Sequence, residues 1–262
     1  MISVIIPVYN GEETIVRAVV SVLSQTNQDF ELVVVNDGSI DGTEQVLKEL
    51  IKSLAPDISS KIRYFYKENS GPSDSRNFGI TRSNGSYIAF LDADDEWIED
   101  KLAVQIKLFE KYPKVALIGA DLFFGTRVNR IRTRIVPIRK LLFKNYFTTS
   151  TVIARSSVFR KYVFNKKQKY SEDYRLWLEI CCEFKCMHVR YPVAKHQKRK
   201  HLFGDSGLSA QLNKMEFGEL SNYFDLFKAD KISWYLWLLA SIYSIIKYCR
   251  RILLTRCRKL VG

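Results

Sequence analysis

Three carboxylates, Asp92, Asp94 and Asp95, stand within four residues, shortly after the apolar run 87–90. A buried strand that ends in this way concentrates negative charge at one edge of a sheet, which is costly unless a cation binds there. Hard divalent cations take oxygen ligands, so Mg²⁺ or Mn²⁺ fits the cluster better than Zn²⁺. The alternative is structural: Asp94 or Asp95 caps a helix that begins near Trp97, because Asp is a preferred N-cap residue.

The first 82 residues repeat one pattern three times: an apolar strand, a polar loop and a helix. Strands that alternate with helices indicate an α/β fold with a mostly parallel, Rossmann-like sheet flanked by helices. In such a sheet the loops at the C-terminal strand ends form the ligand crevice, so we expect Asp92 and the earlier loops at one edge. The predicted strands are 2–6, 31–35 and 62–66, and the predicted helices are 12–24, 41–54 and 73–82.

Four motifs in this region resemble, in order and in spacing, those of the family 2 glycosyltransferases. They are residues 3–10 (SVIIPVYN), 35–43 (VNDGSIDGT), 69–79 (NSGPSDSRNFG) and 90–95 (FLDADD). Any one of these motifs alone would be weak, whereas four together are specific. The resemblance implies a GT-A fold, a nucleotide-sugar donor and inversion at the anomeric carbon. Ser75 stands where Ala is usual in the family, which is a small-for-small difference.

The resemblance also implies a site for a UDP-sugar at the strand ends. Asp94 would bind Mn²⁺ or Mg²⁺, which neutralises the charge that builds up on departing UDP. Asp37 and Arg76 would contact the base, and Asp92 would lie near the ribose. The implied nucleotide-binding residues are Pro7, Tyr9, Asn10, Asp37, Asn69, Gly71, Arg76 and Asp92.

A fifth segment, residues 171–178 (SEDYRLWL), resembles the Glu-Asp segment of the family. There the second acid, here Asp173, is the general base that takes the proton from the acceptor hydroxyl. Two acids that open a helix are favoured in their ionised form by the helix dipole, and a base needs an ionised carboxylate. The structural alternative is a capping box in which Ser171 caps the helix.

The basic segment 198–201, which leads to Ser206 and Ser209, resembles the family loop that closes over the diphosphate. His201 would then be a third metal ligand and Arg199 a diphosphate partner. A solvated basic loop without such a role is the alternative. Residues 131–138 and 147–154 are predicted strands. In the enzymes that the chain resembles, this part approaches the acceptor.

Charge is unevenly distributed along the 262 residues. Residues 1–100 hold 8 Lys and Arg against 17 Asp and Glu, whereas residues 101–262 hold 33 against 11. We expect one domain made of a nucleotide-sugar-binding half (1–100) and an acceptor-binding half (101–210), followed by a helical tail (211–262). The basic half suits an anionic acceptor or an anionic membrane surface. Ordinary solvated lysine faces are the alternative.

The tail contains an apolar, aromatic stretch at 232–246, in which 12 of 15 residues are apolar or aromatic. As a helix this stretch rises about 22 Å, short of the roughly 30 Å hydrocarbon core of a bilayer. We expect a helix that lies on the cytoplasmic face of an inner membrane. A helix packed on the catalytic domain is the alternative, and either arrangement allows a homo-oligomer. Six cations follow the stretch: Lys247, Arg250, Arg251, Arg256, Arg258 and Lys259.

The five cysteines are expected to be reduced thiols of a cytoplasmic protein, because their number is odd and no signal peptide precedes the first strand. Three of them, Cys181, Cys182 and Cys186, are expected on the helix that follows Asp173. A zinc site with His188 is not expected, because paired CxxC spacing is missing.

Two other classes compete with the glycosyltransferase. A sugar-1-phosphate nucleotidyltransferase should have a Gly-rich, Arg-containing loop after its first strand, and residues 7–11 are not such a loop. A non-catalytic basic protein that binds membrane or nucleic acid agrees with the pI of about 9.5 but leaves the acids unexplained, so we expect no nucleic-acid partner. The resemblance and the tail together favour transfer of a sugar to a hydroxyl of a saccharide or lipid-linked saccharide in bacterial surface-polysaccharide or lipopolysaccharide assembly.

Overall fold

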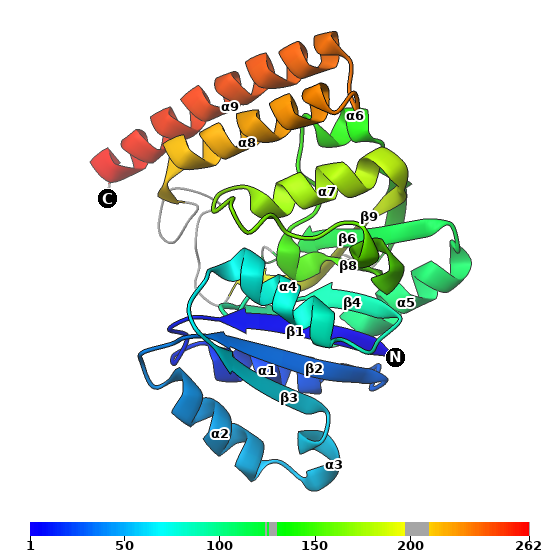
Figure 1. The fold of residues 1–262 in the computed structure, drawn as a ribbon, viewed down its shortest axis with the longest axis vertical. Coiled ribbons are helices and arrows are strands. Elements are labelled where there is room, and N and C mark those ends of the chain that lie inside the picture. The colour runs from blue at the N-terminus through cyan, green and yellow to red at the C-terminus, as the bar shows by residue number, and fades with distance from the viewer. Residues whose placement is uncertain (124, 126–129, 197–209, 262) are drawn as a thin grey trace.

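The computed structural model describes residues 1–123, 125, 130–196 and 210–261, which form a nine-stranded sheet with helices on both faces (Figure 1). The strand order is β3-β2-β1-β4-β8-β6-β9-β5, and β7 pairs with β9. The strands are β1 (Ile2–Val8), β2 (Phe30–Asp37), β3 (Ile62–Lys67), β4 (Tyr87–Phe90), β5 (Asp95–Trp97), β6 (Val115–Leu122), β7 (Arg132–Ile135), β8 (Ile153–Arg155) and β9 (Lys185–His196).

The first four strands are parallel, and their C-terminal ends meet at one edge of the sheet, as predicted. In the register, Ile5 of β1 lies opposite both Val33 of β2 and Phe90 of β4, and all three side chains are buried. Gly79 lets a helix pack closely on β1, because a Cβ at that position would lie 2.5 Å from the side chain of Ile5. The helices of this half are α1 (Ile15–Leu23), α2 (Thr43–Ser53), α3 (Pro56–Ser59) and α4 (Pro72–Arg82).

Beyond β4 the sheet is mixed, so the expectation of a mostly parallel sheet holds for the first half. β8 runs antiparallel to both β4 and β6, β6 runs parallel to β9, and β5 and β7 run antiparallel to β9. The helical elements between these strands are α5 (Lys101–Lys111), α6 (Ile138–Leu141), η1 (Thr149–Thr151), η2 (Ser156–Arg160) and α7 (Glu172–Glu183).

Four local predictions need correction. The helix expected near Trp97 is a strand, β5, because the Trp97 indole donates a hydrogen bond to the Ser150 carbonyl and the backbone pairs with β9. The segment 131–138 is a strand only as far as Ile135, and most of 147–154 is the 3₁₀ turn η1 and its flanks. Cys186 lies on β9, because α7 already ends at Glu183.

The C-terminal helices α8 (Leu212–Lys228) and α9 (Trp234–Val261) lie side by side at the top of Figure 1. Ala240 of α9 is buried, and Lys247 and Arg251 form ion pairs of 2.7 and 3.0 Å with Glu219 and Glu216 of α8. Two of the six cations of the tail therefore neutralise acids of the neighbouring helix. No helix among the described residues is long and apolar enough to cross a bilayer.

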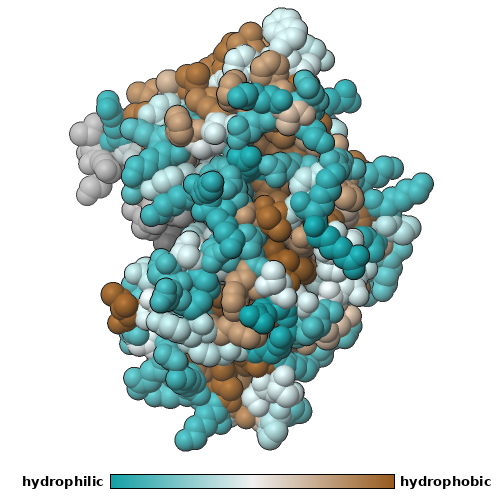
Figure 2. All heavy atoms as spheres, in the orientation of Figure 1, coloured by the Kyte–Doolittle hydropathy of each residue, from teal (hydrophilic) through white to brown (hydrophobic). Residues whose placement is uncertain are grey.

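The face of α9 turned away from α8 is apolar and exposed. Residues three and four apart share one face of a helix, and six such residues form a continuous line that we call the outer stripe. Figure 2 shows hydrophobic side chains gathered at the top of the molecule, over this helix pair. The outer stripe consists of Tyr235, Leu239, Ile242, Ile246, Cys249 and Leu253.

Candidate functional site

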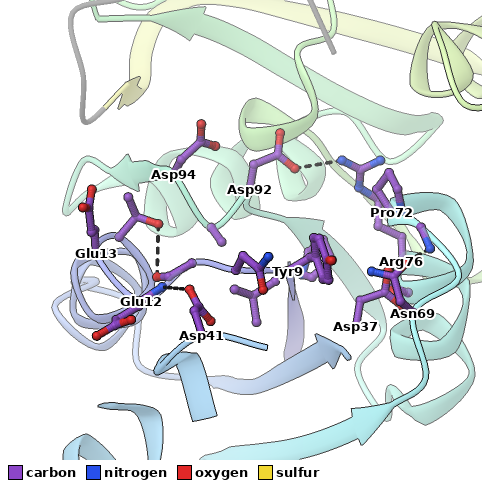
Figure 3. Close-up of a pocket in the computed structure, with 18 of the residues that line it drawn as sticks. Tyr9, Glu12, Glu13, Asp37, Asp41, Asn69, Pro72, Arg76, Asp92 and Asp94 are labelled. Atoms are coloured by element: carbon purple, nitrogen blue, oxygen red, sulfur yellow. Dashed lines mark hydrogen bonds and ion pairs between the residues drawn. The ribbon is translucent and has the colours of Figure 1, made fainter. Parts of the chain in front are cut away.

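A cavity of about 790 Å³ opens at the C-terminal ends of β1, β2 and β4; we call it the strand-end cavity (Figure 3). It brings together all eight residues that the sequence assigned to the nucleotide, and Asp94 as well. Further lining residues that the sequence did not single out include Glu12, Glu13 and Lys169. The nine residues assigned in advance are Pro7, Tyr9, Asn10, Asp37, Asn69, Gly71, Arg76, Asp92 and Asp94.

One wall of the cavity is built by the loops after β1 and β2, which hold each other. The backbone N–H of Asn10 donates to Ser39 Oγ at 3.0 Å, and Asn10 Oδ1 accepts from the N–H of Ile40 at 3.0 Å. Asn10 has a φ of 51°, a left-handed conformation that Asn tolerates better than most residues. The Tyr9 side chain next to it is half exposed at 50% and is therefore available to stack on a flat ligand.

Asp37 holds the loop that forms the opposite wall. Its Oδ1 accepts from Lys67 Nζ at 2.7 Å and from the N–H of Ser70 at 3.1 Å, and its Oδ2 accepts from the N–H of Gly71 at 2.8 Å. Gly71 has a φ of 92°, a conformation that favours glycine. A carboxylate has about four acceptor positions, so these three donors leave about one acceptor position of Asp37 for a ligand.

Arg76 connects the cavity to α7. Its Nη2 lies 2.8 Å from Asp92 Oδ1, and its Nη1 lies 3.0 Å from Oε1 of Glu172, a residue 96 positions later in the chain. Burial alone would lower the pKa of this guanidinium, but the two carboxylates raise it. Its two terminal nitrogens thus form ion pairs with acids of two different sequence motifs. Contact of Arg76 with the base of a nucleotide stays a prediction.

Asp173 lies in the first turn of α7, where its Oδ2 accepts a hydrogen bond from Thr149 Oγ1 at 3.0 Å. Burial raises the pKa of Asp173, an effect that Arg76 opposes. The pKa of the neighbouring Glu172 is raised to about 7, first by burial and then by the charge of Asp173. A carboxylate with a raised pKa is a better proton acceptor at neutral pH, which is the property a general base needs.

The capping-box alternative for this segment is wrong. Ser171 adopts a left-handed backbone with φ of 55°, and its side chain forms no cap hydrogen bond with α7. Its hydroxyl instead donates to the carbonyl of Met215 on α8 at 3.1 Å. The serine therefore fixes the start of α7 against the C-terminal helices.

The three aspartates after β4 divide into two kinds. Asp92 and Asp94 line the cavity, as Figure 3 shows, whereas Asp95 is only 2% exposed and points into the protein. Asp95 accepts from Ser150 Oγ at 2.5 Å and pairs with His196 Nδ1 at 2.5 Å. Asp95 therefore does not cap a helix, and the hydrogen bond that His196 donates to it raises the pKa of His196.

The oxygen ligands at the cavity fit a hard divalent cation only in part. Asp92 and Asp94 offer two carboxylates, and no cluster of three or more His, Cys, Asp or Glu suited to a metal occurs in the described part of the chain. Two carboxylates are nevertheless enough for Mg²⁺, which is commonly bound by one or two carboxylates together with substrate phosphates. His201 and Arg199, the expected further ligands, lie outside the described residues.

Sequence reasoning missed the part played by η1 and by His196. Thr149 binds Asp173, while Ser150 accepts from the N–H of Asp92 at 3.1 Å and donates to Asp95. The signal was visible as a polar run, 148–151, inside an otherwise apolar segment. A lone histidine such as His196 carries no comparable signal, because its partner lies 101 residues away.

The sequence model of glycosyl transferase family 2 matches residues 3–167. The chain belongs to glycosyltransferase family 2. It is similar, at 32% identity over 83% of its length, to an uncharacterized glycosyltransferase of Rickettsia bellii. It is also similar, at 41% identity over 41% of each chain, to a putative teichuronic acid biosynthesis glycosyltransferase of Bacillus subtilis. The chain spans about a third of the length of the first Rickettsia relatives it matches, 31% in the case of R. bellii.

Two solved structures show that this family 2 glycosyltransferase has the GT-A fold. Staphylococcus aureus TarS in complex with UDP-GlcNAc superposes with a TM-score of 0.69 at 19% identity, over 88% of this chain and 69% of that one. The Pyrobaculum calidifontis mannosyltransferase PcManGT, in complex with GDP-Man and Mn²⁺, superposes with a TM-score of 0.68 at 18% identity, over 94% and 73%. The prediction of an α/β GT-A fold is thereby confirmed.

Proposed function

We propose that this glycosyltransferase moves a sugar from a UDP-sugar to an acceptor hydroxyl, with inversion, in a reaction that depends on Mn²⁺ or Mg²⁺. The observation that carries the proposal is the continuous connection from the strand-end cavity to Asp173. Asp92 at the cavity binds Arg76, Arg76 binds Glu172, and Glu172 directly precedes Asp173. A donor in the cavity and an acceptor at Asp173 would therefore share one reaction centre.

The nucleotide would be bound by the two walls of the strand-end cavity. Tyr9 offers an exposed ring for stacking, and Asp37 retains about one acceptor position for an imino or amino group of a base. Pro7, Asn10, Asn69 and Gly71 complete this pocket. UDP is the favoured nucleotide because family 2 enzymes commonly use it, and a solved structure with this fold holds UDP-GlcNAc.

A divalent cation would be held by Asp94, with Asp92 beside it near the ribose. When bound, the cation supplies charge neutralisation for the leaving diphosphate. Lys169 is an exposed lysine that lines the cavity, and we assign it a contact with the same diphosphate. His201 and Arg199 keep the roles of third metal ligand and diphosphate partner as proposals.

Asp173 would act as the general base of a single displacement. It takes the proton of the acceptor hydroxyl as that oxygen attacks the anomeric carbon, and the bond from this carbon to the diphosphate oxygen breaks on the opposite face. Thr149 orients the carboxylate through the 3.0 Å hydrogen bond, and Arg76 stabilises the neighbouring negative charge. The enzyme needs no covalent intermediate in this scheme.

The acceptor would be a saccharide or a lipid-linked saccharide of a bacterial surface glycan. The relative named for teichuronic acid biosynthesis supports a surface polymer, although it shares only 41% of this chain. The outer stripe of α9 supports binding to a membrane surface, because it is an exposed line of apolar side chains. Arg250 and Arg256 are exposed near the C-terminal end of the same helix. We propose that the enzyme lies peripherally on the cytoplasmic face of the inner membrane.

The proposed reaction is tested by UDP release. The full chain is incubated with a panel of UDP-sugars, Mn²⁺ and a saccharide or lipid-linked acceptor, and a parallel panel uses GDP-mannose. UDP release that requires both acceptor and metal supports the proposal. Turnover of GDP-mannose alone would overturn the choice of nucleotide.

A further inference from the structure

A second cavity, of about 550 Å³, lies on the acceptor half of the sheet and shares no lining residue with the strand-end cavity. We call it the basic cavity, because four of its seven lining residues are Lys or Arg and only one is an acid. It is built by the β7–β9 ladder, by β6 and by the segment after α6. The lining residues are Asp121, Arg132, Thr133, Arg134, Lys144, His188 and Arg190.

The strand register places two arginines directly opposite each other in this cavity. Arg132 of β7 pairs with Arg190 of β9, and Arg134 of β7 pairs with His188 of β9. Alternate residues of a strand point to the same face, so all four side chains share one face of the ladder. Like charges in directly opposed positions destabilise a sheet. Folding alone therefore gives no reason for this arrangement.

In the described part of the chain, the four cations of the basic cavity lack ion-pair partners. Among the described residues, no carboxylate lies within ion-pair distance of Arg132, Arg134, Lys144 or Arg190. Asp121 is the one acid that lines the cavity. It lies 3.1 Å from Nε2 of His188, so its carboxylate faces this histidine. Four cations thus line the basic cavity against the single carboxylate of Asp121.

The floor of the basic cavity is preorganised. His188 is 7% exposed, and its ring lies 5.5 Å from the ring of Tyr146. The guanidinium of Arg134 lies over the same Tyr146 ring at 4.2 Å, and Lys144 Nζ lies over it at 5.3 Å. Burial, followed by the charges of Arg134 and Lys144, lowers the pKa of His188, although Asp121 opposes this. A neutral imidazole leaves Asp121 with its negative charge and adds no further cation.

We propose that the basic cavity binds a phosphate group of an anionic molecule, either a soluble phosphate ester or phosphodiester or the headgroup of an anionic lipid. Arginine forks match phosphate oxygens in two-point hydrogen bonds, and two opposed arginines with a nearby lysine surround such a group from several sides. A bound phosphate would also relieve the repulsion between Arg132 and Arg190. The inference concerns a site separate from the donor site, so UDP binding and phosphate binding can fail independently.

The test uses the full chain, inorganic phosphate as the probe and a charge-matched control. The double variant Arg132→Gln/Arg190→Gln removes the opposed pair, and Arg139→Gln/Lys140→Gln removes two exposed cations of α6 that do not line the cavity. The ring resonances of the chain's three histidines are followed by NMR during titration with phosphate, at constant ionic strength. We expect a saturable shift of the His188 signal in the wild type and in the control, and its loss in the cavity variant. No saturable shift in the wild type, or equal loss in both variants, overturns the proposal.

Thermal unfolding gives a second readout that does not depend on NMR. Without phosphate, the cavity variant should melt at the same or a higher temperature than the wild type, because it lacks the opposed charges. Phosphate should raise the melting temperature of the wild type and of the control more than that of the cavity variant. An equal rise in all three proteins contradicts the proposal.

A vesicle arm distinguishes the two sources of phosphate. Co-sedimentation is measured with phosphatidylcholine vesicles that do or do not contain phosphatidylglycerol. Weaker binding of the cavity variant than of the control to the anionic vesicles supports a lipid headgroup. Equal binding of both variants, together with loss of the His188 response in the cavity variant, supports a soluble phosphate compound. In both cases the assigned site stands.

Discussion

The two cavities differ in the way their charges are satisfied by the protein itself. Around the strand-end cavity each prominent acid already has partners: Asp37 accepts three N–H donors, Asp92 binds Arg76, and Asp95 binds Ser150 and His196. In the basic cavity Arg132 and Arg190 face each other instead. The acids of the first region thus build the walls of their own site, whereas the four cations of the second have no ion-pair partner among the described residues.

The same difference explains why one region has recognisable motifs. In the donor half a residue such as Asp37 has a chemical partner within the fold and a position at a strand end, so its type and spacing are both constrained. The basic cavity needs positive charge, but several arrangements of Lys and Arg would serve. The chain beyond residue 100 therefore has charge as its main sequence signature, at 33 Lys and Arg against 11 acids.

The largest effect is expected from Asp173→Asn. The variant should bind UDP as the wild type does, yet turn over about 100-fold more slowly or worse, as expected for loss of a general base. Asp225→Asn is the matched control, because Asp225 is an acid on the surface of α8 that pairs with Arg175 of α7. Turnover at the wild-type rate in Asp173→Asn would remove this residue from the mechanism.

Glu172→Gln should change the dependence of stability on pH. The pKa of Glu172 is raised to about 7 in the folded protein, above its ordinary value of 4.5, so folding favours the protonated form. This residue therefore makes the wild type less stable as pH rises from about 4.5 to 7. Relative to the wild type, Glu172→Gln should gain about 3 kcal/mol in free energy of unfolding over that window, because the pKa rises from 4.5 to about 7 and each pKa unit corresponds to about 1.4 kcal/mol.

Urea denaturation of both proteins at several pH values measures this difference. The gain should appear in the difference between the two curves, since groups distant from Glu172 titrate equally in both proteins and cancel in that difference. A difference that stays constant from pH 4 to 8 would mean that Glu172 ionises normally in the folded state.

Tyr9→Ala should weaken UDP binding about tenfold, because stacking of a base on an aromatic ring contributes roughly 1–3 kcal/mol. Tyr66→Ala serves as the control, since Tyr66 is 55% exposed, comparable with 50% for Tyr9, but does not line the strand-end cavity. Calorimetry with UDP measures both variants. Equal affinities would place the base away from Tyr9.

The smallest effect is expected at the outer stripe. Leu239→Gln/Ile246→Gln should reduce co-sedimentation with anionic vesicles a few-fold and leave UDP binding unchanged, because each residue contributes apolar area at the surface of a bilayer. The control is Val163→Gln/Phe217→Gln, two exposed apolar residues outside α9. Point variants test the stripe better than removal of α9, which would leave Glu216 and Glu219 without Lys247 and Arg251.

The sequence predicted the first half of the fold well because its signals are local. Runs of β-branched residues, loop residues such as Asn10 and helix spacing each act over a few positions. The prediction failed where distant contacts decide: Trp97 is in a strand because of Ser150 and β9. Likewise no local pattern reveals that Lys247 neutralises Glu219 across two helices.

The residues of the candidate site also divide into those that local motifs predicted and those that depend on distant contacts. The strand-end cavity followed from motifs that lie between residues 3 and 95, all on one edge of a parallel sheet. The connection from Arg76 to Glu172 spans 96 residues and depends on the position of α7 against α4, which a single sequence does not encode in any short pattern. Burial of Asp95 against His196 was hidden for the same reason.

The central claim is that the strand-end cavity binds UDP together with a divalent cation at Asp94. The most direct test is calorimetry of UDP binding in the wild type and in Asp94→Asn, each with Mn²⁺ and with a chelator. We expect tight binding only for the wild type with Mn²⁺, and affinities about tenfold or more weaker in the other three cases, in line with the loss of a metal ligand. Equal affinities in all four cases would contradict the account.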